Sequence, residues 1–442
     1  MKLFGTDGIR AEAGKFPLDA TTVYRIGRAF GRRIRRAGAF GIVGGDTRES
    51  TPGILGAVAE GIGAEGVAIR NAGVVPTPAV ADLVRDAGAA FGIAISASHN
   101  PWRDNGIKFF GPDGRKLPDA EEAAIEDSLP DETGEPAGLA PPSVLPELAR
   151  RYADRLVSAV PERIDGIAVA LDCGNGATFE LGPRVFERAG ARVEALGTHP
   201  DGRNINEGCG ALHPEGLSAL VGRGRFDLGA AFDGDADRLI LCDETGRLLD
   251  GDDVLWMLAR DAHGRGRLDP PIVVGTVMSN FGLERSLATL GVKLLRTPVG
   301  DRHVVRVMQE TGASIGGETS GHVILAELST TGDGALAALR VAALLARSGV
   351  PLSRLADLRK APQVLRNLRV SRRVPLDEVV HLARAMAEAE EALAGNGRVL
   401  LRYSGTEPLL RVMVEGTDRR EVERLADGLC AVAARELGTA AP

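Results

Sequence analysis

The chain is poor in the residues that would place it in several common protein classes. Its 442 residues include only four cysteines, Cys173, Cys209, Cys242 and Cys430, which are dispersed and lack metal-ligand spacing. This pattern excludes a disulfide framework, fits a reducing compartment and predicts buried free thiols. No stretch approaches the roughly 20 apolar residues of a membrane span, and the N-terminus has no apolar signal core. We therefore expect a cytoplasmic protein with no membrane partner.

Excess positive charge is also absent. Lys and Arg number 53 against 60 Asp and Glu, for a net charge of -7, which disfavours broad nucleic-acid binding. Aromatic residues are only 4%, so the cores must rely on Ala, Val, Leu and Ile, while 57 glycines supply permissive turns. The ordinary balance of 44% hydrophobic and 26% charged residues indicates a folded protein of several domains.

Three segments share one local pattern, in which a short apolar, β-rich run meets a Gly, Asn or Asp turn and then a helical stretch. They begin near Ile42, Ile167 and Ile272. Strand, loop and helix units in series favour α/β layering with partly parallel, mixed sheets. The sequence therefore predicts three similar α/β domains.

Two breaks help to divide the chain. Residues 128–147 are rich in Pro and acids and predict a surface connection, followed by a helix over 148–160. A second break at 359–363 precedes a smaller α+β unit. The predicted domains are 1–160, 161–253, 254–366 and 367–442, arranged around one central cleft.

The first polar loop with chemical potential follows the apolar run AAFGIAIS. The stretch ASHNPWRDNGIKFF is expected to form a loop that places Ser98, His99 and Lys108 at a strand end. Ser98 could be a nucleophile or phosphate carrier, His99 a proton donor or positioning group, and Lys108 a cation or acid/base group. An N-capping serine with a hydrogen-bonded histidine is the structural alternative.

A second loop, DGDADR, lies between two apolar runs and carries Asp233, Asp235 and Asp237 at alternating positions. Three converging carboxylates repel one another unless a hard divalent cation neutralises them, and Mg²⁺ suits oxygen ligands and phosphate chemistry. The adjacent Arg238 could steady an acid or a phosphate. The alternative is an acidic, solvated hairpin turn.

Two further motifs suggest ligand contacts. In GETSGHVIL, Glu318, Ser320 and His322 alternate, so an extended backbone would direct all three to one face suited to sugar hydroxyls; a solvent-facing strand edge is the alternative. The motif RYSGTEPLLRVMVEG predicts two strands around a turn that could cradle an anion, or a plain hairpin. Its candidate ligands are Arg402, Ser404, Gly405, Thr406 and Arg411. Near the N-terminus, Arg10 could face the phosphate or merely form an ion pair at the surface.

In order, the motifs resemble those of the α-D-phosphohexomutase family, in particular its bacterial amino-sugar branch, over nearly the whole chain. They are GTDGIR (Gly5–Arg10), SASHNP (Ser96–Pro101), DNGIKFF (Asp104–Phe110), DGDADR (Asp233–Arg238), GETSGHVIL (Gly317–Leu325) and RYSGTEPLLRVMVEG (Arg402–Gly416). An ordered set of this kind is far more specific than any single motif.

The resemblance implies an isomerase that interconverts glucosamine 6-phosphate and glucosamine 1-phosphate for amino-sugar and cell-wall precursor synthesis. It implies a phosphorylated Ser98, a sugar 1,6-bisphosphate intermediate or activator, and one Mg²⁺ held by Ser98, Asp233, Asp235 and Asp237. Ser98, His99, Lys108 and Arg238 would be catalytic. The hexosamine phosphate would be bound by Arg10, Glu318, Ser320 and His322, together with Arg402, Ser404, Gly405, Thr406 and Arg411. A homodimer is also expected.

Two other activities stay open. A phosphoglucomutase or phosphomannomutase of the same family would share the chemistry and differ in the sugar. A metal-dependent sugar phosphatase using Ser98 and the three aspartates would release inorganic phosphate and would not need the C-terminal anion cradle. A silent sugar-phosphate sensor would have no need of Ser98 together with three metal carboxylates.

Overall fold

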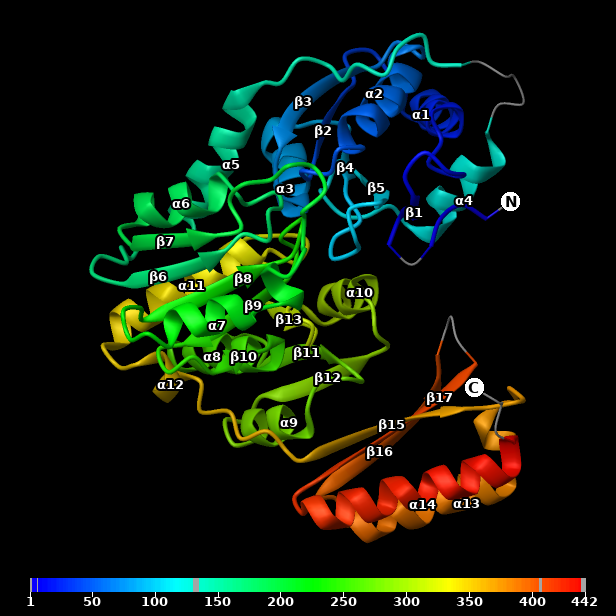
Figure 1. Cartoon of the computed structure of the whole chain (residues 1–442), viewed down its shortest axis with the longest axis vertical. Helices are drawn as coiled ribbons and strands as arrows, with labels where there is room; N and C mark the ends of the chain where they lie inside the picture. Colours follow the sequence, from blue (N-terminus) through cyan, green and yellow to red (C-terminus); the bar gives the residue numbers. More distant parts are fainter. Residues whose placement is uncertain (1, 6, 130–134, 405–407, 439–442) are drawn as a thin grey trace. The chain divides into compact units, whose positions relative to one another are not determined.

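The structure is a computed structural model that describes residues 2–5, 7–129, 135–404 and 408–438. The chain divides into two compact units, Met1–Thr276 with Thr297–Asp357, and Val277–Arg296 with Leu358–Pro442 (Figure 1). None of the described helices is long and apolar enough to cross a membrane. Compactness separates two units rather than four domains, so the predicted domain boundaries stay a prediction.

The N-terminal part of the first unit is built on a five-stranded mixed sheet in the order β1-β5-β4-β2-β3. Its strands are β1 (Ile9–Glu12), β2 (Phe40–Gly45), β3 (Ala68–Val74), β4 (Phe91–Ile95) and β5 (Asp104–Phe110). Strand β2 is parallel to β3 and β4, whereas β5 is antiparallel to β4 and β1. The accompanying helices are α1 (Ala20–Ile34), α2 (Thr51–Gly63), α3 (Thr77–Ala87), α4 (Asp119–Asp127) and α5 (Pro146–Ser158).

A second five-stranded sheet has the order β10-β9-β8-β6-β7, in which β9-β8-β6-β7 repeat the arrangement of β5-β4-β2-β3, while the antiparallel edge strand comes last in the chain rather than first. Its strands are β6 (Ala168–Asp172), β7 (Arg192–Leu196), β8 (Leu228–Phe232), β9 (Leu239–Asp243) and β10 (Leu248–Leu249). Strand β6 is parallel to β7 and β8, and β9 is antiparallel to β8 and β10. The helical segments are α6 (Leu181–Ala189), the 3₁₀ turn η1 (Gly210–Leu212) and α7 (Glu215–Val221).

The third part of the first unit has the same strand sequence in shorter form. Strand β11 (Ile272–Thr276) is parallel to β13 (Ile315–Gly317), and β13 is antiparallel to β14 (Val323–Leu325). The helices of this part are α8 (Gly251–Gly264), α10 (Asp301–Thr311), α11 (Gly334–Ser348) and α12 (Leu352–Leu355). Helix α9 (Phe281–Ala288) and most of β12 (Lys293–Thr297) belong to the second compact unit.

This repetition fixes where the polar loops lie. The β4–β5, β8–β9 and β13–β14 connections each leave the carboxyl end of a parallel strand and enter an antiparallel neighbour. Carboxyl ends of parallel strands are where α/β proteins place their ligands. The prediction of three similar α/β domains with mixed sheets is confirmed, and the three loops are topologically equivalent.

Small and branched apolar residues fill the cores, as the low aromatic content predicts. An aromatic cluster packs against the first sheet, where the Phe30 ring centroid lies 5.1 Å from that of Phe91 and 4.9 Å from that of Phe109. All four cysteines are free, and Cys173 and Cys242 are buried as predicted, whereas the other two are half-buried.

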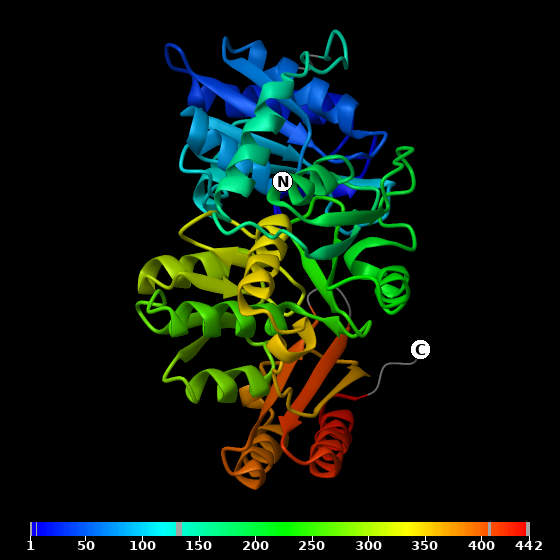
Figure 2. The ribbon, with the colours of Figure 1, turned by 90° about the vertical axis from the view of Figure 1, so that its left-hand side faces the viewer.

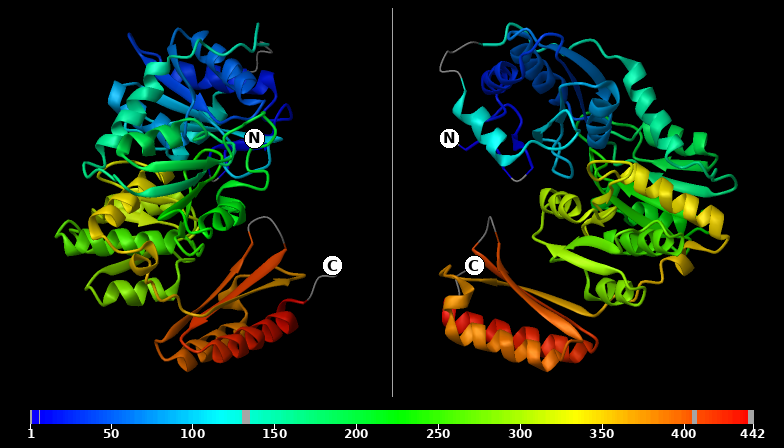
Figure 3. Two further views of the ribbon diagram at one scale, coloured as in Figure 1. Left: turned by 60° about the vertical axis from the view of Figure 1, so that its left-hand side comes forward. Right: turned by 180° about the vertical axis from the view of Figure 1, so that it is seen from behind.

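The second unit contains a three-stranded antiparallel sheet with two long helices. Its strands are β15 (Gln363–Arg369), β16 (Gly397–Tyr403) and β17 (Leu409–Gly416), in the order β15-β17-β16. Helices α13 (Val380–Leu393) and α14 (Arg419–Leu437), preceded by the 3₁₀ turn η2 (Leu376–Glu378), lie on the same face of this sheet (Figures 2 and 3). Alternate residues of β17, such as Val412 and Val414, pack there with Leu425 and Leu429 of α14. The predicted α+β unit is confirmed.

Candidate active site

Ser98 occupies a tight, buried turn between β4 and β5. Its φ of 53° lies in the left-handed region, which costs a non-glycine residue about 1–3 kcal/mol. The turn holds it there: the Ser98 N–H donates to Ser96 Oγ at 2.8 Å, and Asn206 Nδ2 donates to the Ser98 carbonyl at 3.0 Å. The next element is a strand, so the N-capping interpretation of Ser98 is wrong.

Arg48 anchors the same turn from beneath. Its guanidinium is fully buried and donates to the carbonyls of Ser98, Asn100, Pro101 and Asp104 and to the Asp46 carboxylate. Asp46 in turn accepts a hydrogen bond from Ser96 Oγ at 2.6 Å. Sequence reasoning missed Arg48, although an arginine two residues after Asp46, at the end of the apolar strand FGIVGG, is a visible signal.

The Ser98 hydroxyl faces the aspartate loop. Ser98 Oγ donates to Asp233 Oδ2 at 2.5 Å and lies 3.1 Å from His99 Nδ1. Burial, together with the negative charges of Asp237 and Asp235, raises the pKa of Asp233 to about 8. The nucleophile candidate and the first predicted metal ligand are therefore in direct contact.

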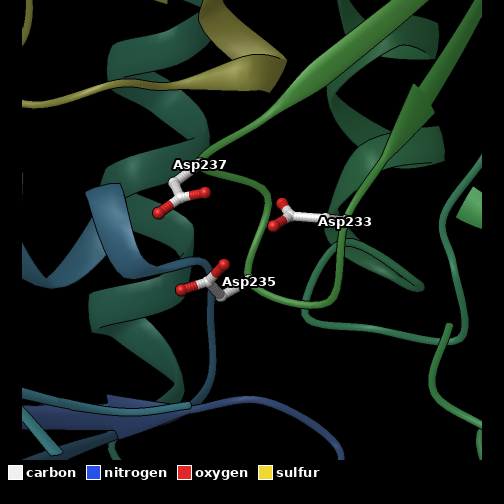
Figure 4. A group of neighbouring side chains, drawn as sticks. All are labelled: Asp233, Asp235 and Asp237. Carbon is white, nitrogen blue, oxygen red and sulfur yellow. The ribbon is translucent and has the colours of Figure 1, made fainter. Parts of the chain in front are cut away.

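The three aspartates lie together in the β8–β9 connection (Figure 4), where one oxygen from each falls within 4.8 Å of the others. All three side chains are buried. Asp235 Oδ1 and Asp237 Oδ1 have no hydrogen-bond partner among the described residues. Buried carboxylate oxygens without partners are costly, and a hard divalent cation would satisfy them. The donor set therefore fits a metal ion, which argues against the solvated-hairpin alternative.

Lys108 lies in the centre of strand β5 rather than in a loop, so the loop expectation for Asp104–Phe110 is wrong. The alternation of apolar residues in NGIKFF was the overlooked strand signal. Lys108 Nζ lies 2.8 Å from Asp235 Oδ2 and 3.2 Å from Asp237 Oδ2. Burial opposes the charged form, yet the carboxylates of Asp235, Asp7 and Asp237 outweigh it and raise the pKa of Lys108 well above its usual value.

Arg238 and His99 lie on either side of this acidic centre. The Arg238 N–H donates to Asp233 Oδ1 at 3.2 Å, and its guanidinium Nε lies 3.9 Å from Asp237 Oδ1. Burial and the positive charges of Arg238 and Arg10 lower the pKa of His99 to about 4. His99 is therefore neutral at physiological pH, and its Nδ1 can exchange a hydrogen bond with Ser98 Oγ.

The residues predicted to bind sugar lie in the β13–β14 hairpin. The expected extended face is wrong, because Glu318–His322 form a turn closed by a hydrogen bond from the Glu318 N–H to the His322 carbonyl at 2.9 Å. Ser320 is exposed, Glu318 is half-buried, and Glu318 Oε1 accepts the Gly300 N–H at 2.9 Å. His322 is buried with Nδ1 3.8 Å from Asp237 Oδ2, so it links this loop to the aspartate loop.

A network of partly buried charges, missed from the sequence, connects these loops. Lys116 forms ion pairs with Asp7 and Asp301, while Asp7 also lies 3.3 Å from Lys108 Nζ. Asp301 Oδ2 lies 3.8 Å from His322 Nε2. Although burial acts against it, the charges of Asp301 and Asp7 raise the pKa of Lys116. Positive and negative charges thus alternate from the N-terminal segment to helix α10.

Arg10 is placed in this network as well. Its Nη2 atom lies 2.6 Å from Asp7 Oδ2, whereas its Nε atom is buried without a partner among the described residues. A guanidinium that keeps an unused, buried donor can still bind an anion. Arg10 therefore forms an ion pair, as one expectation had it, and also keeps an N–H donor, free within the described part of the chain, of the kind that the other expectation, a phosphate contact, requires.

The second unit carries the predicted anion cradle. Arg402 on β16 and Arg411 on β17 are directly paired across the two strands, and burial and Arg411 together lower the pKa of Arg402. Arg411 Nε is buried without a partner in the described part of this unit. Ser404 is buried beside them, while Gly405 and Thr406 lie outside the described residues. Two guanidinium groups side by side favour a bound anion.

Four family models match consecutive parts of the chain, all described as domains of phosphoglucomutase/phosphomannomutase. Three are α/β/α domains, matching residues 1–135 (domain I), 150–246 (domain II) and 250–361 (domain III). The fourth is the C-terminal domain, matching residues 365–432. Together they span most of the chain, in the order of the three repeated sheets and the final α+β unit.

Comparison with individual proteins and solved structures points to the same family. The phosphoglucosamine mutase of Solibacter usitatus is 46% identical over 441 residues, covering 99% of both chains. A crystal structure of a phosphoglucomutase/phosphomannomutase family protein from Burkholderia thailandensis is 26% identical, with a TM-score of 0.82 over 99% of this chain and 98% of that one. The structure of Aspergillus fumigatus N-acetylphosphoglucosamine mutase with GlcNAc-6P and magnesium shares the fold at 17% identity and a TM-score of 0.64, covering 99% of this chain and 96% of that one. The chain therefore belongs to the phosphoglucomutase/phosphomannomutase family of α-D-phosphohexomutases.

Proposed function

We propose that this enzyme interconverts glucosamine 6-phosphate and glucosamine 1-phosphate, with Ser98 as the phosphoryl carrier. The observation that supports the carrier role is the buried Ser98 hydroxyl, held in a strained turn 2.5 Å from Asp233 Oδ2. The choice of glucosamine is supported by the near-full-length similarity to the phosphoglucosamine mutase of Solibacter usitatus. The activity would supply amino-sugar and cell-wall precursors.

In the proposed cycle, phosphorylated Ser98 gives its phosphoryl group to O1 of glucosamine 6-phosphate. The O–P bond at Ser98 breaks as the sugar O–P bond forms, giving a 1,6-bisphosphate. The bisphosphate then reorients, and its 6-phosphoryl group returns to Ser98, releasing glucosamine 1-phosphate. The serine is phosphorylated again at the end of the turnover.

The metal would be one Mg²⁺ held by Asp233, Asp235, Asp237 and the Ser98 phosphate, and it would neutralise the charge on the transferring group. Lys108 would be the acid/base group that the family resemblance implies; its raised pKa keeps it as an ammonium group beside Asp235 and Asp237, the form that donates a proton. The guanidinium of Arg238 would stabilise the equatorial phosphoryl oxygens, and the neutral His99 would orient Ser98 Oγ.

The remaining predicted residues would bind the substrate. Glu318, Ser320 and His322 would contact the sugar hydroxyls, and Arg10 would face a phosphate. In the second unit, Arg402, Ser404, Gly405, Thr406 and Arg411 would hold the phosphate that is not transferred. We also propose a homodimer acting in the cytoplasm; light scattering of the purified protein tests the dimer.

The decisive experiment measures turnover on glucosamine, glucose and mannose 6-phosphates in parallel, with Mg²⁺ and a bisphosphate activator, while released inorganic phosphate is monitored. We expect the highest kcat/KM for glucosamine 6-phosphate and no phosphate release. Preference for glucose or mannose phosphate would assign a phosphoglucomutase or phosphomannomutase instead. Phosphate release without isomer formation would indicate a phosphatase. Ser98→Ala is the matched control that removes one oxygen and should abolish turnover in every case.

A further inference from the structure

An arginine-lined cavity of about 270 Å³ lies in the first unit, away from every residue predicted for catalysis. Its walls come from the end of α5, from α8 and α11, and from the ends of β13 and β14 that lie away from the Glu318–His322 turn. Apolar side chains line part of it, namely Leu258, Ile315, Leu325, Leu328 and Ala343. The volume is just below the roughly 300–1,000 Å³ of drug-sized ligand sites, which suits a small metabolite.

The charged residues that line this cavity are mainly basic. Four arginines and two carboxylates line it, an excess of two positive charges: Arg265, Arg267, Arg340 and Arg347 against Asp261 and Glu327. In a chain whose net charge is -7, such a concentration of arginine around one cavity runs against the overall composition. Cavities lined by one sign of charge focus the field and concentrate ions of opposite sign.

Two of the arginines are partly neutralised by neighbouring acids. Arg347 Nη2 lies 2.6 Å from Asp261 Oδ1 and its Nη1 lies 3.5 Å from Glu162 Oε1. Arg265 lies 3.3 Å from the same Glu162 oxygen and 3.8 Å from Asp261 Oδ2. Two carboxylates are thus shared between two guanidinium groups, which fixes those groups at the cavity and leaves a third without an ion pair within the described ranges.

Arg340 is that third guanidinium. It projects from α11, is half-buried, and donates one hydrogen bond, to the Ala159 carbonyl at 3.2 Å. Among the described residues no carboxylate comes within 4 Å of it. Burial lowers the pKa of Arg340, the charges of Glu162 and Asp261 act against that effect, and the charges of Arg265 and Arg347 add to it. A desolvated guanidinium with unused donors is stabilised by an anion that reaches it.

We propose that this cavity binds the phosphate group of a small phosphate monoester through Arg340 and its neighbouring arginines, with the organic part against the apolar wall. Planar guanidinium groups match phosphate oxygens in pairs, which makes arginine the usual residue for this purpose. Inorganic phosphate would leave much of the cavity unfilled, so the ligand carries a carbon skeleton of a few atoms. The site is separate from the proposed catalytic reaction and does not depend on it.

The test uses glycerol 3-phosphate, which is a phosphate monoester but not an aldose and so cannot enter the mutase reaction. Calorimetric titration would be carried out on the full-length Arg402→Met protein, in which the anion cradle of the second unit is weakened. We expect binding to persist in this protein and to weaken at least tenfold when Arg340→Met is added. Unchanged affinity in the double variant would overturn the proposal.

Three controls sharpen the result. Arg347→Met, added to the Arg402→Met protein, should also weaken binding. It serves as the test variant if the protein with Arg340→Met does not fold. Arg184→Met removes an exposed arginine on α6, outside this cavity, and should leave the affinity unchanged. Inorganic phosphate and succinate are titrated in parallel, and we expect weaker binding of both. Equal or tighter binding of either one would overturn the assignment of a phosphate monoester.

Discussion

Replacing Arg48 should disable the enzyme through the shape of the serine turn rather than through the chemistry. Its guanidinium is fully buried and hydrogen-bonds the carbonyls of four residues in the segment from Ser98 to Asp104 as well as Asp46. Arg48→Met would leave those carbonyls unsatisfied and the Asp46 carboxylate unpaired in a buried site. The turn would then lose the interactions that offset the positive φ of Ser98.

The magnitude follows from the contacts. Removing one partner of a buried ion pair typically costs about 3–5 kcal/mol, and each hydrogen bond to a charged group contributes about 1.5–3 kcal/mol. Burial already raises the pKa of Asp46, so protonation would relieve part of the loss. We therefore expect Arg48→Met to lower the free energy of unfolding by about 3–5 kcal/mol, and Arg48→Lys, which keeps the charge with fewer donors, by about half as much.

Urea-induced unfolding followed by far-UV circular dichroism measures the stability, and hydrogen–deuterium exchange measures the turn directly. In Arg48→Met the amides of Ser96–Asp104 should exchange faster than those of α1, and turnover should fall at least a hundredfold. The surface variant Arg163→Met is the control and should match the wild type. Wild-type exchange in the turn, together with an unfolding free energy within about 1 kcal/mol of the wild type, would refute this account of the turn.

Further predictions concern other elements of the first unit. Asp235→Asn should raise the Mg²⁺ concentration needed for half-maximal turnover at least tenfold, and an unchanged titration would rule out this aspartate as a ligand. Tyr152→Phe removes a buried 2.7 Å hydrogen bond to Asp333 and should cost about 1–3 kcal/mol in urea unfolding, whereas no loss would show that the bond contributes nothing. Burial raises the pKa of Asp333 to about 6, so the wild type should lose stability as the pH rises from about 4 through 6. Asp333→Asn keeps the cap of α11 and should gain about 2–3 kcal/mol relative to the wild type across that range; parallel pH profiles would contradict the shifted pKa.

The sequence predicts the parts of the fold that depend on local patterns. Apolar runs followed by turns and helical stretches predict the α/β units, and the three aspartates between two apolar runs predict the acidic site, because β8 and β9 lie directly beside it. Two local predictions were wrong for a shared reason. Lys108 lies within a strand, although its polar segment was expected to be a loop, and Glu318–His322 form a turn, although their alternation was expected to mark a strand. In both segments the pattern of polar residues did not distinguish a strand from a loop.

Contacts between distant segments could not be read from the sequence. Lys116 pairs with Asp7 and Asp301, which are 109 and 185 residues away in the chain. Asn206 reaches the Ser98 carbonyl across 108 residues. Periodicity reports which face of an element is buried, not which loop of another sheet it meets. The catalytic roles themselves rest on the family resemblance and stay predictions until variants are assayed.

The repeated topology explains why the chemistry divides as it does. The β4–β5, β8–β9 and β13–β14 connections leave equivalent strands, yet each carries one kind of group: a buried hydroxyl at Ser98, carboxylates around Asp235, and polar side chains beside Glu318. The three loops occupy the same position in three separate sheets. The sequence of one loop can therefore differ without disturbing the strands that carry the other two. The contacts that join them, from Ser98 Oγ to Asp233 and from His322 to Asp237, are between loops and not within any one sheet. Exchanging the Glu318–His322 loop for that of a relative that prefers another sugar should therefore change the preferred sugar phosphate while leaving phosphorylation of Ser98, measured by intact-protein mass spectrometry, in place. Loss of both properties together would show that the loops act as one unit.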